Sequence, residues 1–346
     1  QFCFDSITSA KAEDLKRLFY TEYKQPNGET NYAAYILGSN LFCSFNKDGI
    51  LTQADSLTPE LKTDGIYIVN KDSFYIFTSD HYDFNLYLFI NNKIKRHWKP
   101  DSKENTATLL RTYFIFNPFH DFKIFEKNNR LYCVVNAPLI DLNNGLPAKD
   151  ISSGTPQLSI IALRDSIMKI DFSFASFDNI TAYHMDYVTT FTYINDSIIA
   201  YTSEAQPDIY FYNILSRKFI KQWNPDFKYF RKNSIYDTDS ISSPDYTNRY
   251  RCSNTRKYFL KYNPANKTLY CMYTLPQSMD TDTVPIAGQG DFILAALDPY
   301  HYKLKQEYRF NGKQYFNVGA MFFEDKIGVA RNVNPNYKRC YDIFSF

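Results

Sequence analysis

The chain has 346 residues, 18% of them aromatic, and a formal net charge of +2. A charge this close to zero gives no reason to expect a nucleic-acid partner. No apolar run reaches the roughly 18 residues that a membrane-spanning helix needs, so the sequence predicts no transmembrane segment. The 30 Tyr and 30 Phe favour half-buried pleated surfaces, and an all-β fold is therefore expected.

The first elements in chain order are a short strand, a short helix and a group of strands. Residues 1–7 (QFCFDSI) form an isolated strand-like run. Residues 10–16 fit an amphipathic helix that precedes the first strand of a larger group. That group holds four apolar runs between residues 16 and 55, and Asn27-Gly28 supplies a hairpin turn between the first two.

A long internal repeat organises the centre of the chain. The segment Asp72–Asp80 (DSFYIFTSD) recurs as Asp196–Glu204 (DSIIAYTSE), and each copy is followed by two more apolar runs. These end in Trp98-Lys99-Pro100 and Trp223-Asn224-Pro225. Each copy predicts a four-stranded antiparallel meander. Because the two Trp residues occupy equivalent positions, we expect each to pack between meanders rather than to hold a ligand.

The same template fits the chain six times and predicts a six-bladed β-propeller of four-stranded antiparallel blades, a single domain over residues 1–346. The last blade is one strand short, so we expect the N-terminal strand to pair beside the C-terminal one and close the ring. Cys3 and Cys340 would then lie on neighbouring strands, where a disulfide is geometrically feasible. The predicted blades are residues 16–55, 62–100, 119–175, 187–225, 250–310 and 314–346 with 1–7.

The cysteines predict neither a metal site nor a redox motif. None of the six shows CxxC spacing, and the sequence predicts no metal and no other cofactor. Their even number would permit three disulfides. Four of them lie in apolar strand-like runs, for which a buried free thiol is the simpler interpretation: Cys43, Cys133, Cys271 and Cys340.

Several segments carry a family resemblance. The hairpin KYFLKYNPANKTLYCMY (257–273), the stretches DFILAALDPYHYKLKQEYRF (291–310) and FEDKIGVARN (323–332), and the repeated Asp-Ser strand openings provide it. With these motifs the chain resembles a family of uncharacterised bacterial six-bladed propellers that are secreted or are lipoproteins. The resemblance covers residues 16–346 and carries over no catalytic residue. It implies export, with the protein secreted or held at the cell surface or outer membrane by a lipid anchor upstream of residue 1.

Loop lengths predict where binding groups lie. In a propeller, the hairpins between first and second and between third and fourth strands open on one face, and all other connections open on the opposite face. The former are short here and the latter long, so we expect every long loop on one face, where binding groups concentrate. The long loops are 99–121, 136–156, 175–187, 225–255 and 274–290.

The candidate site residues come from these loops. The weak catalytic candidates, His120 with Asp121 and His184 with Asp186, could act as acid–base pairs or contribute to a metal site, although solvated loop side chains show the same spacing. The Asp-rich stretches lack the spacing of a calcium loop. The ligand-binding candidates combine groups that suit an anionic or sugar ligand: Tyr246, Arg249, Arg251, Asp280 and Asp282.

No recognised catalytic motif is present: the sequence has no GxSxG elbow, no HExxH and no phosphate-binding Gly-rich loop. A non-catalytic, monomeric propeller of the bacterial cell envelope that binds an envelope protein or a glycan is therefore favoured. Two alternatives stay open, since propellers host many functions. One is a carbohydrate-active enzyme of lyase, lactonase or glycosidase type that uses His and Asp residues of the long-loop face. The other is a purely structural role.

Overall fold

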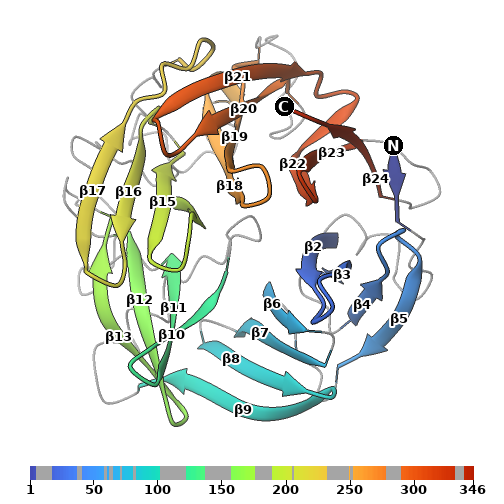
Figure 1. Cartoon of the computed structure of the whole chain (residues 1–346), viewed down its shortest axis with the longest axis vertical. Coiled ribbons are helices and arrows are strands. Elements are labelled where there is room, and N and C mark those ends of the chain that lie inside the picture. The colour runs from blue at the N-terminus through green and yellow to red at the C-terminus, as the bar shows by residue number, and fades with distance from the viewer. Residues whose placement is uncertain are drawn as a thin grey trace.

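The computed structural model shows an all-β, propeller-like ring of antiparallel four-stranded meanders (Figure 1). Strands β2, β6, β18 and β22 lie towards the centre of the ring, and β5, β9, β17 and β21 lie on its outside. The structure describes residues 1–4, 18–36, 41–57, 61, 65–70, 72–80, 83–101, 122–136, 157–175, 189–204, 206–231, 249, 252–277, 290–331 and 339–346. The helix expected over residues 10–16 lies outside these ranges.

Three of the sheets are four-stranded meanders made of consecutive strands. The first sheet holds β2 (Leu18–Lys24), β3 (Thr30–Ile36), β4 (Leu41–Phe45) and β5 (Leu51–Ser56). A second holds β14 (Thr189–Tyr193), β15 (Ile198–Ser203), β16 (Ile209–Asn213) and β17 (Lys218–Trp223). A third holds β18 (Arg256–Asn263), β19 (Thr268–Thr274), β20 (Phe292–Asp298) and β21 (Lys303–Phe310).

Two further meanders merge into one eight-stranded sheet, of order β10-β11-β12-β13-β9-β8-β7-β6. Their outermost strands, β13 and β9, pair in parallel over only two residue pairs, Ile167 with Lys99 and Met168 with Pro100. The hydrogen-bonded sheets therefore number five among the described residues, not the six that the sequence predicts. The strands are β6 (Gly65–Asn70), β7 (Ser73–Asp80), β8 (Asp83–Ile90), β9 (Lys93–Pro100), β10 (Ile124–Lys127), β11 (Arg130–Asn136), β12 (Leu158–Arg164) and β13 (Ile167–Phe174).

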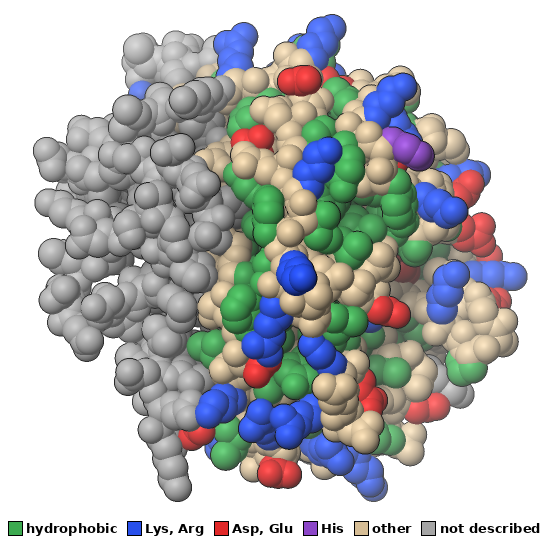
Figure 2. All heavy atoms as spheres, turned by 60° about the vertical axis from the view of Figure 1, so that its left-hand side comes forward, with side chains coloured by type: hydrophobic (Ala, Val, Ile, Leu, Met, Phe, Trp, Pro, Cys, Tyr) green, Lys and Arg blue, Asp and Glu red, His purple; other side chains and the backbone are tan. Residues whose placement is uncertain are grey.

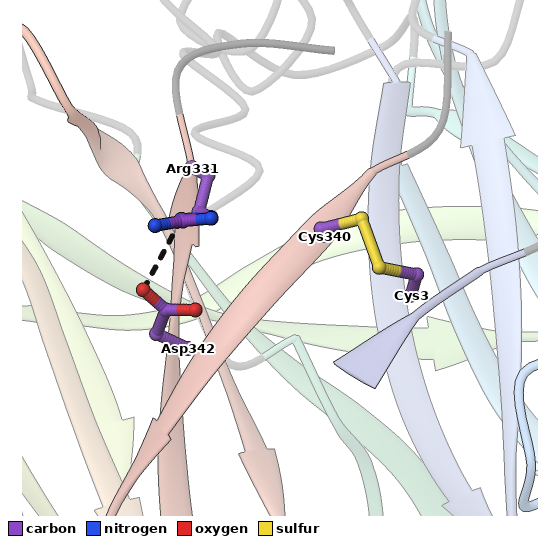
Figure 3. Close-up of a disulfide and its surroundings, with 4 residues drawn as sticks. All are labelled: Cys3, Arg331, Cys340 and Asp342. Carbon is purple, nitrogen blue, oxygen red and sulfur yellow. Dashed lines mark ion pairs between the residues drawn. A yellow bond between two sulfur atoms is a disulfide. The ribbon is translucent and has the colours of Figure 1, made fainter. Parts of the chain in front are cut away.

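The closing sheet joins the two ends of the chain. It contains β22 (Tyr315–Phe323), β23 (Lys326–Arg331), β24 (Cys340–Phe344) and β1 (Phe2–Cys3), in the order β1-β24-β23-β22. Cys3 pairs with Cys340 in the β1–β24 register, and the two form a disulfide (Figure 3). The predicted pairing of the terminal strands is confirmed, and Cys340 is not the free thiol that its strand context favoured. Cys43, Cys133, Cys252 and Cys271 are buried and free.

The hydrophobic core lies between neighbouring meanders. Trp98 is 1% exposed and packs in a cluster with Phe77 of β7 and Ile161 of β12. Trp223 is 9% exposed and packs in a cluster with side chains of the β18–β21 sheet, including Leu269. Both indoles are therefore packed between meanders, which confirms the structural interpretation of the repeat.

Short hairpin turns distinguish one end of each meander from the other. Asn91 and Asn92 join β8 to β9, and Asn128 and Asn129 join β10 to β11, all with φ between 52° and 58°. Asn tolerates this left-handed conformation, which the tightest β-hairpins require. Because the meanders are antiparallel, the turns between their first and second and between their third and fourth strands share one end of the sheets. We call it the hairpin end.

Candidate functional site

Most site residues predicted from the sequence lie outside the described part of the chain. Arg249 is the exception, and its side chain is partly exposed. The grouping of these residues on one face therefore stays a prediction, and so does the common face of the five long loops. The residues outside the described ranges are His120, Asp121, His184, Asp186, Tyr246, Arg251, Asp280 and Asp282.

Neither a metal centre nor a membrane-spanning helix is found among the residues that the structure describes. No group of three or more His, Cys, Asp and Glu side chains there could hold a metal ion. No described helix is long and apolar enough to cross a membrane.

A pocket of about 630 Å³ opens between the first sheet and the closing sheet, at the hairpin end. One wall is built from the β2–β3 and β4–β5 turns of the first sheet, and the other from the β22–β23 turn, β24 and β1. The residues that line it are Phe2, Gly28, Glu29, Thr30, Tyr32, Lys47, Asp48, Phe323, Glu324, Lys326, Ile343 and Ser345. No sequence pattern indicates this pocket, because its walls come from opposite ends of the chain.

Three aromatic rings form the apolar side of the pocket. The ring centroid of Phe2 lies 5.6 Å from that of Tyr32 and 4.8 Å from that of Phe323, and the last two lie 5.7 Å apart. Tyr32 and Phe323 are buried, at 4% and 7% exposed. Burial, followed by the charges of Glu22 and Glu324, raises the pKa of Tyr32 to about 12. Its hydroxyl therefore stays protonated at neutral pH and can donate a hydrogen bond.

Gly49 allows the terminal strand to sit beside the pocket. It lies in the β4–β5 turn at φ +78°, and a Cβ atom added there would stand 2.8 Å from the carbonyl oxygen of Cys3 and 2.9 Å from Cζ of Phe2. Only glycine meets both demands without strain, because other residues disfavour this φ and carry the Cβ atom that would clash. The turn thus positions Phe2 as one border of the pocket.

Charged side chains of both signs surround the opening: Glu29, Asp48 and Glu324 are acidic, and Lys47 and Lys326 are basic. Lys47 Nζ lies 3.7 Å from Glu29 Oε1, and the two side chains are 63% and 43% exposed. A pair this exposed contributes little to stability, so its groups are available to a ligand. The pocket combines aromatic contact area with hydrogen-bonding groups, which suits binding.

A second polar cluster lies buried between the β14–β17 and β18–β21 sheets. Glu204 and Arg256 form an ion pair there, with side chains 4% and 3% exposed. Next to it, Lys257 donates to Thr202 Oγ1 and, at 3.0 Å, to the carbonyl oxygen of Asp208. Burial lowers the pKa of Lys257 to about 8. These pairings link residues of two sheets, so the cluster joins the two sheets.

Inner strands of three sheets are also linked by charge. Lys261 Nζ of β18 lies 3.5 Å from Glu22 Oε1 of β2, and it stands 5.1 Å from the ring centroid of Phe322 of β22. The second oxygen of Glu22, Oε2, is buried without a hydrogen-bond partner among the described residues. This pair ties the first sheet to the β18–β21 sheet across the strand that lies between them.

The β13–β17 side of the ring has a mixed surface. Figure 2 brings the β13–β17 side forward and shows apolar side chains mixed with lysine and arginine. Phe219 and Ile220 of β17 are 56% and 42% exposed, and lysines flank them. Isolated exposed apolar residues between charges are ordinary protein surface.

No protein-family model and no curated protein sequence matches the chain. Among solved structures, it is similar to a member of the DUF4221 family from Bacteroides vulgatus, with 13% identity, a TM-score of 0.74, and coverage of 100% of this chain and 97% of that one. A second similar structure is a protein of unknown function from Bacteroides caccae, with 8% identity, a TM-score of 0.42, and coverage of 84% of this chain and 81% of that one. A third is the WD40 β-propeller domain of Doa1, with 9% identity, a TM-score of 0.45, and coverage of 93% of this chain and 78% of that one. At 13% identity the first similarity is one of fold, and it extends over the whole length of the chain.

Proposed function

We propose that the chain is a non-catalytic, six-bladed β-propeller of the bacterial cell envelope that binds an envelope protein or a glycan as a monomer. Single-domain organisation over residues 1–346 is part of the proposal. Six blades are supported by the short contact between β9 and β13, since two residue pairs join meanders that are otherwise each complete. On this view the eight-stranded sheet is two blades in contact at their outer edges.

The disulfide supports export. Disulfides persist in extracellular and periplasmic proteins and are rare in the reducing cytosol. Cys3 and Cys340 are bonded across 337 positions of sequence. The full-length similarity in fold to a protein from Bacteroides vulgatus fits a bacterial origin. Secretion, or anchoring by a lipid upstream of residue 1, follows as the proposed location.

The observation that carries the binding function is the pocket between the first sheet and the closing sheet. Ligand sites are typically concave, of 300 to 1,000 Å³, with apolar walls and a few polar groups that orient the ligand. The pocket has about 630 Å³, an aromatic side and a charged rim. Such a surface suits a sugar ring or a peptide. The predicted long-loop candidates, Arg249 among them, would form a second surface at the other end of the sheets.

A glycan array and a pull-down from envelope extract test this function. Each is run with the wild type and with a Lys47→Glu/Lys326→Glu variant, which reverses both basic groups of the rim. A Lys218→Glu/Lys303→Glu variant changes exposed lysines on the outer strands β17 and β21 and serves as the control. We expect a ligand whose affinity falls about tenfold or more in the rim variant and is unchanged in the control. If neither assay detects a bound ligand and the protein turns over a saccharide, the proposal is rejected.

A further inference from the structure

We propose that β9 and the neighbouring start of β13 form a basic surface that binds a bilayer of anionic phospholipids. The surface lies on the outside of the ring, where the end of β9 meets the start of β13, at the lower left of Figure 1. We call it the seam surface, and it consists of residues 93–101 and 164–169. It is separate from the pocket, so the inference goes beyond the proposed function.

Positive charge is concentrated on the seam surface. Its residues include six Lys or Arg and two Asp, which gives a formal charge of +4, whereas the whole chain carries +2. The rest of the chain is therefore negative overall, and the seam surface is where anions are attracted. Figure 2 brings this side of the ring forward and shows Lys and Arg side chains gathered at its lower end. The six cations are Lys93, Lys95, Arg96, Lys99, Arg164 and Lys169.

The cations of β9 are not engaged within the protein. All four are exposed, and none forms an ion pair or a side-chain hydrogen bond in the part of the chain that the structure describes. On β21, by contrast, Lys305 donates to Thr268 Oγ1 at 2.8 Å. Arg309 of the same strand lies 2.8 Å from a carboxylate oxygen of Asp291. The cations of β9 are thus available to an external partner to a degree that those of β21 are not.

Protection of an exposed sheet edge does not account for this charge. Lysine on an outermost strand discourages pairing with another sheet. The outermost strand of the first sheet, β5 (LTQADS), lies equally on the outside of the ring and has no Lys or Arg. In addition, Lys99 lies where β9 is already paired, because it stands opposite Ile167 of β13. The outer position therefore does not by itself require four cations.

The strand register places an apolar side chain between two of the cations. Ile167 stands opposite Lys99 of β9 and opposite Arg164 of β12. Directly opposite residues share a face of the sheet, and strands lie about 4.8 Å apart, so the two cations flank Ile167 within about 10 Å. An exposed aliphatic residue alone is ordinary surface, and Ile167 is 41% exposed. At an anionic bilayer, however, cations bind the phosphates while such a side chain enters the acyl boundary.

The spread of the cations favours an extended anionic surface over a small anion. Lys93 and Lys99 are six residues apart, which corresponds to about 20 Å along a strand. A single phosphate contacts one or two of these groups, whereas an array of lipid phosphates contacts all of them. An anionic polysaccharide is the other extended partner, but it makes no use of Ile167. The observations therefore favour the bilayer.

Vesicle sedimentation with the intact chain tests the proposal. The vesicles contain phosphatidylglycerol and phosphatidylcholine in equal amounts, and phosphatidylcholine alone is the uncharged comparison. The Lys95→Gln/Arg96→Gln/Lys99→Gln variant removes three exposed cations of β9. Each cation near an anionic bilayer strengthens binding about fivefold, so we expect about 100-fold weaker binding by this variant. Raising the salt concentration from about 0.1 M to about 1 M should release the wild type, because it shortens the Debye length to about 3 Å.

A matched variant separates the seam surface from the overall charge. Lys218→Gln/Lys221→Gln/Lys303→Gln removes the same charge from exposed positions of β17 and β21. We expect this variant to bind the vesicles within about twofold of the wild type, since its lysines lie outside the proposed contact. Thermal unfolding verifies that each variant is folded.

A polarity-sensitive label locates the contact. It is attached to Ile167→Cys on the seam surface or, as the control, to Phe219→Cys, whose native side chain is 56% exposed on β17. The free cysteines of the wild type are buried, so the introduced thiol reacts selectively. We expect the emission of the label at position 167 to shift to the blue when anionic vesicles are added. The label at position 219 should not respond.

Each contrary outcome overturns the inference. Equal losses in the two triple variants would show that only the overall charge matters. Absence of sedimentation with anionic vesicles, or no blue shift at position 167, would also reject the proposal. If polygalacturonate displaces the vesicles and binds more tightly to the wild type than to the β9 variant, the partner is an anionic polysaccharide and not a bilayer. The proposed function is tested separately by the rim variant on the glycan array, so the two proposals can fail independently.

Discussion

Removing the disulfide between Cys3 and Cys340 should destabilise the whole ring. The change is the Cys3→Ala/Cys340→Ala variant, or reduction of the wild type. The bond closes a loop whose ends are 337 positions apart. The chain-entropy relation for such a loop gives about 6 kcal/mol at 25 °C, and native disulfides typically contribute about 2 to 5 kcal/mol. Without the bond, β1 would be held in the sheet by only two residue pairs.

Urea unfolding, followed by fluorescence, measures this effect with and without reductant. We expect reduction to lower the unfolding midpoint of the wild type to that of the variant, because Cys3 is exposed and open to the reagent. Reductant should not change the variant, since its remaining cysteines are free. Equal midpoints for oxidised wild type and variant would refute the reasoning, because the terminal strands would then close the ring without a covalent bond.

Three further predictions concern particular residues. Lys257→Met should stabilise the protein by up to about 3 kcal/mol at pH 7, because the folded state disfavours the charged lysine and lowers its pKa from 10.5 to about 8. The advantage should shrink between pH 8 and 10.5, where the lysine of the folded protein is neutral. The same pH dependence of the unfolding free energy in both proteins would contradict this prediction. Glu204→Gln should cost about 3–5 kcal/mol because it leaves Arg256 charged and buried, and adding Arg256→Met should recover part of this loss in a double-mutant cycle. Gly28→Ala should lower the free energy of unfolding by about 1–2 kcal/mol, through its φ of +84° alone. Gly49→Ala should lower it clearly more, because the added Cβ atom meets β1. Equal losses in the two variants would show that the contact with β1 is unimportant.

The strands could be predicted from the sequence because the repeat fixes both their number and their spacing. Residues 72–80 and 196–204 correspond to β7 and β15, each the second strand of a meander. Counting strands also revealed that the last meander lacked one, which led to the pairing of residues 1–7 with the C-terminus. The sequence did not predict the contact between β9 and β13. This contact depends on the relative orientation of two outer strands, which no residue pattern specifies.

The candidate pocket could not be predicted, because loop length pointed to the other end of the sheets. The pocket is built from short turns whose residues are unremarkable in sequence, such as Lys47 and Glu324. They meet only because the ring closes, which places the ring centroid of Phe2 4.8 Å from that of Phe323. The buried cluster was hidden for a similar reason. Lys257 opens a strand-like run, KYFLKY, and only the packing of two sheets shows that its ammonium group binds Thr202.

The disulfide supplements the few main-chain pairs between the described terminal strands. The outermost strands of the other meanders pair with their neighbours over five to seven positions, whereas β1 pairs with β24 over two. A covalent bond at Cys340 adds to the two residue pairs that hold β1 in the closing sheet. Ring stability should therefore depend on this bond.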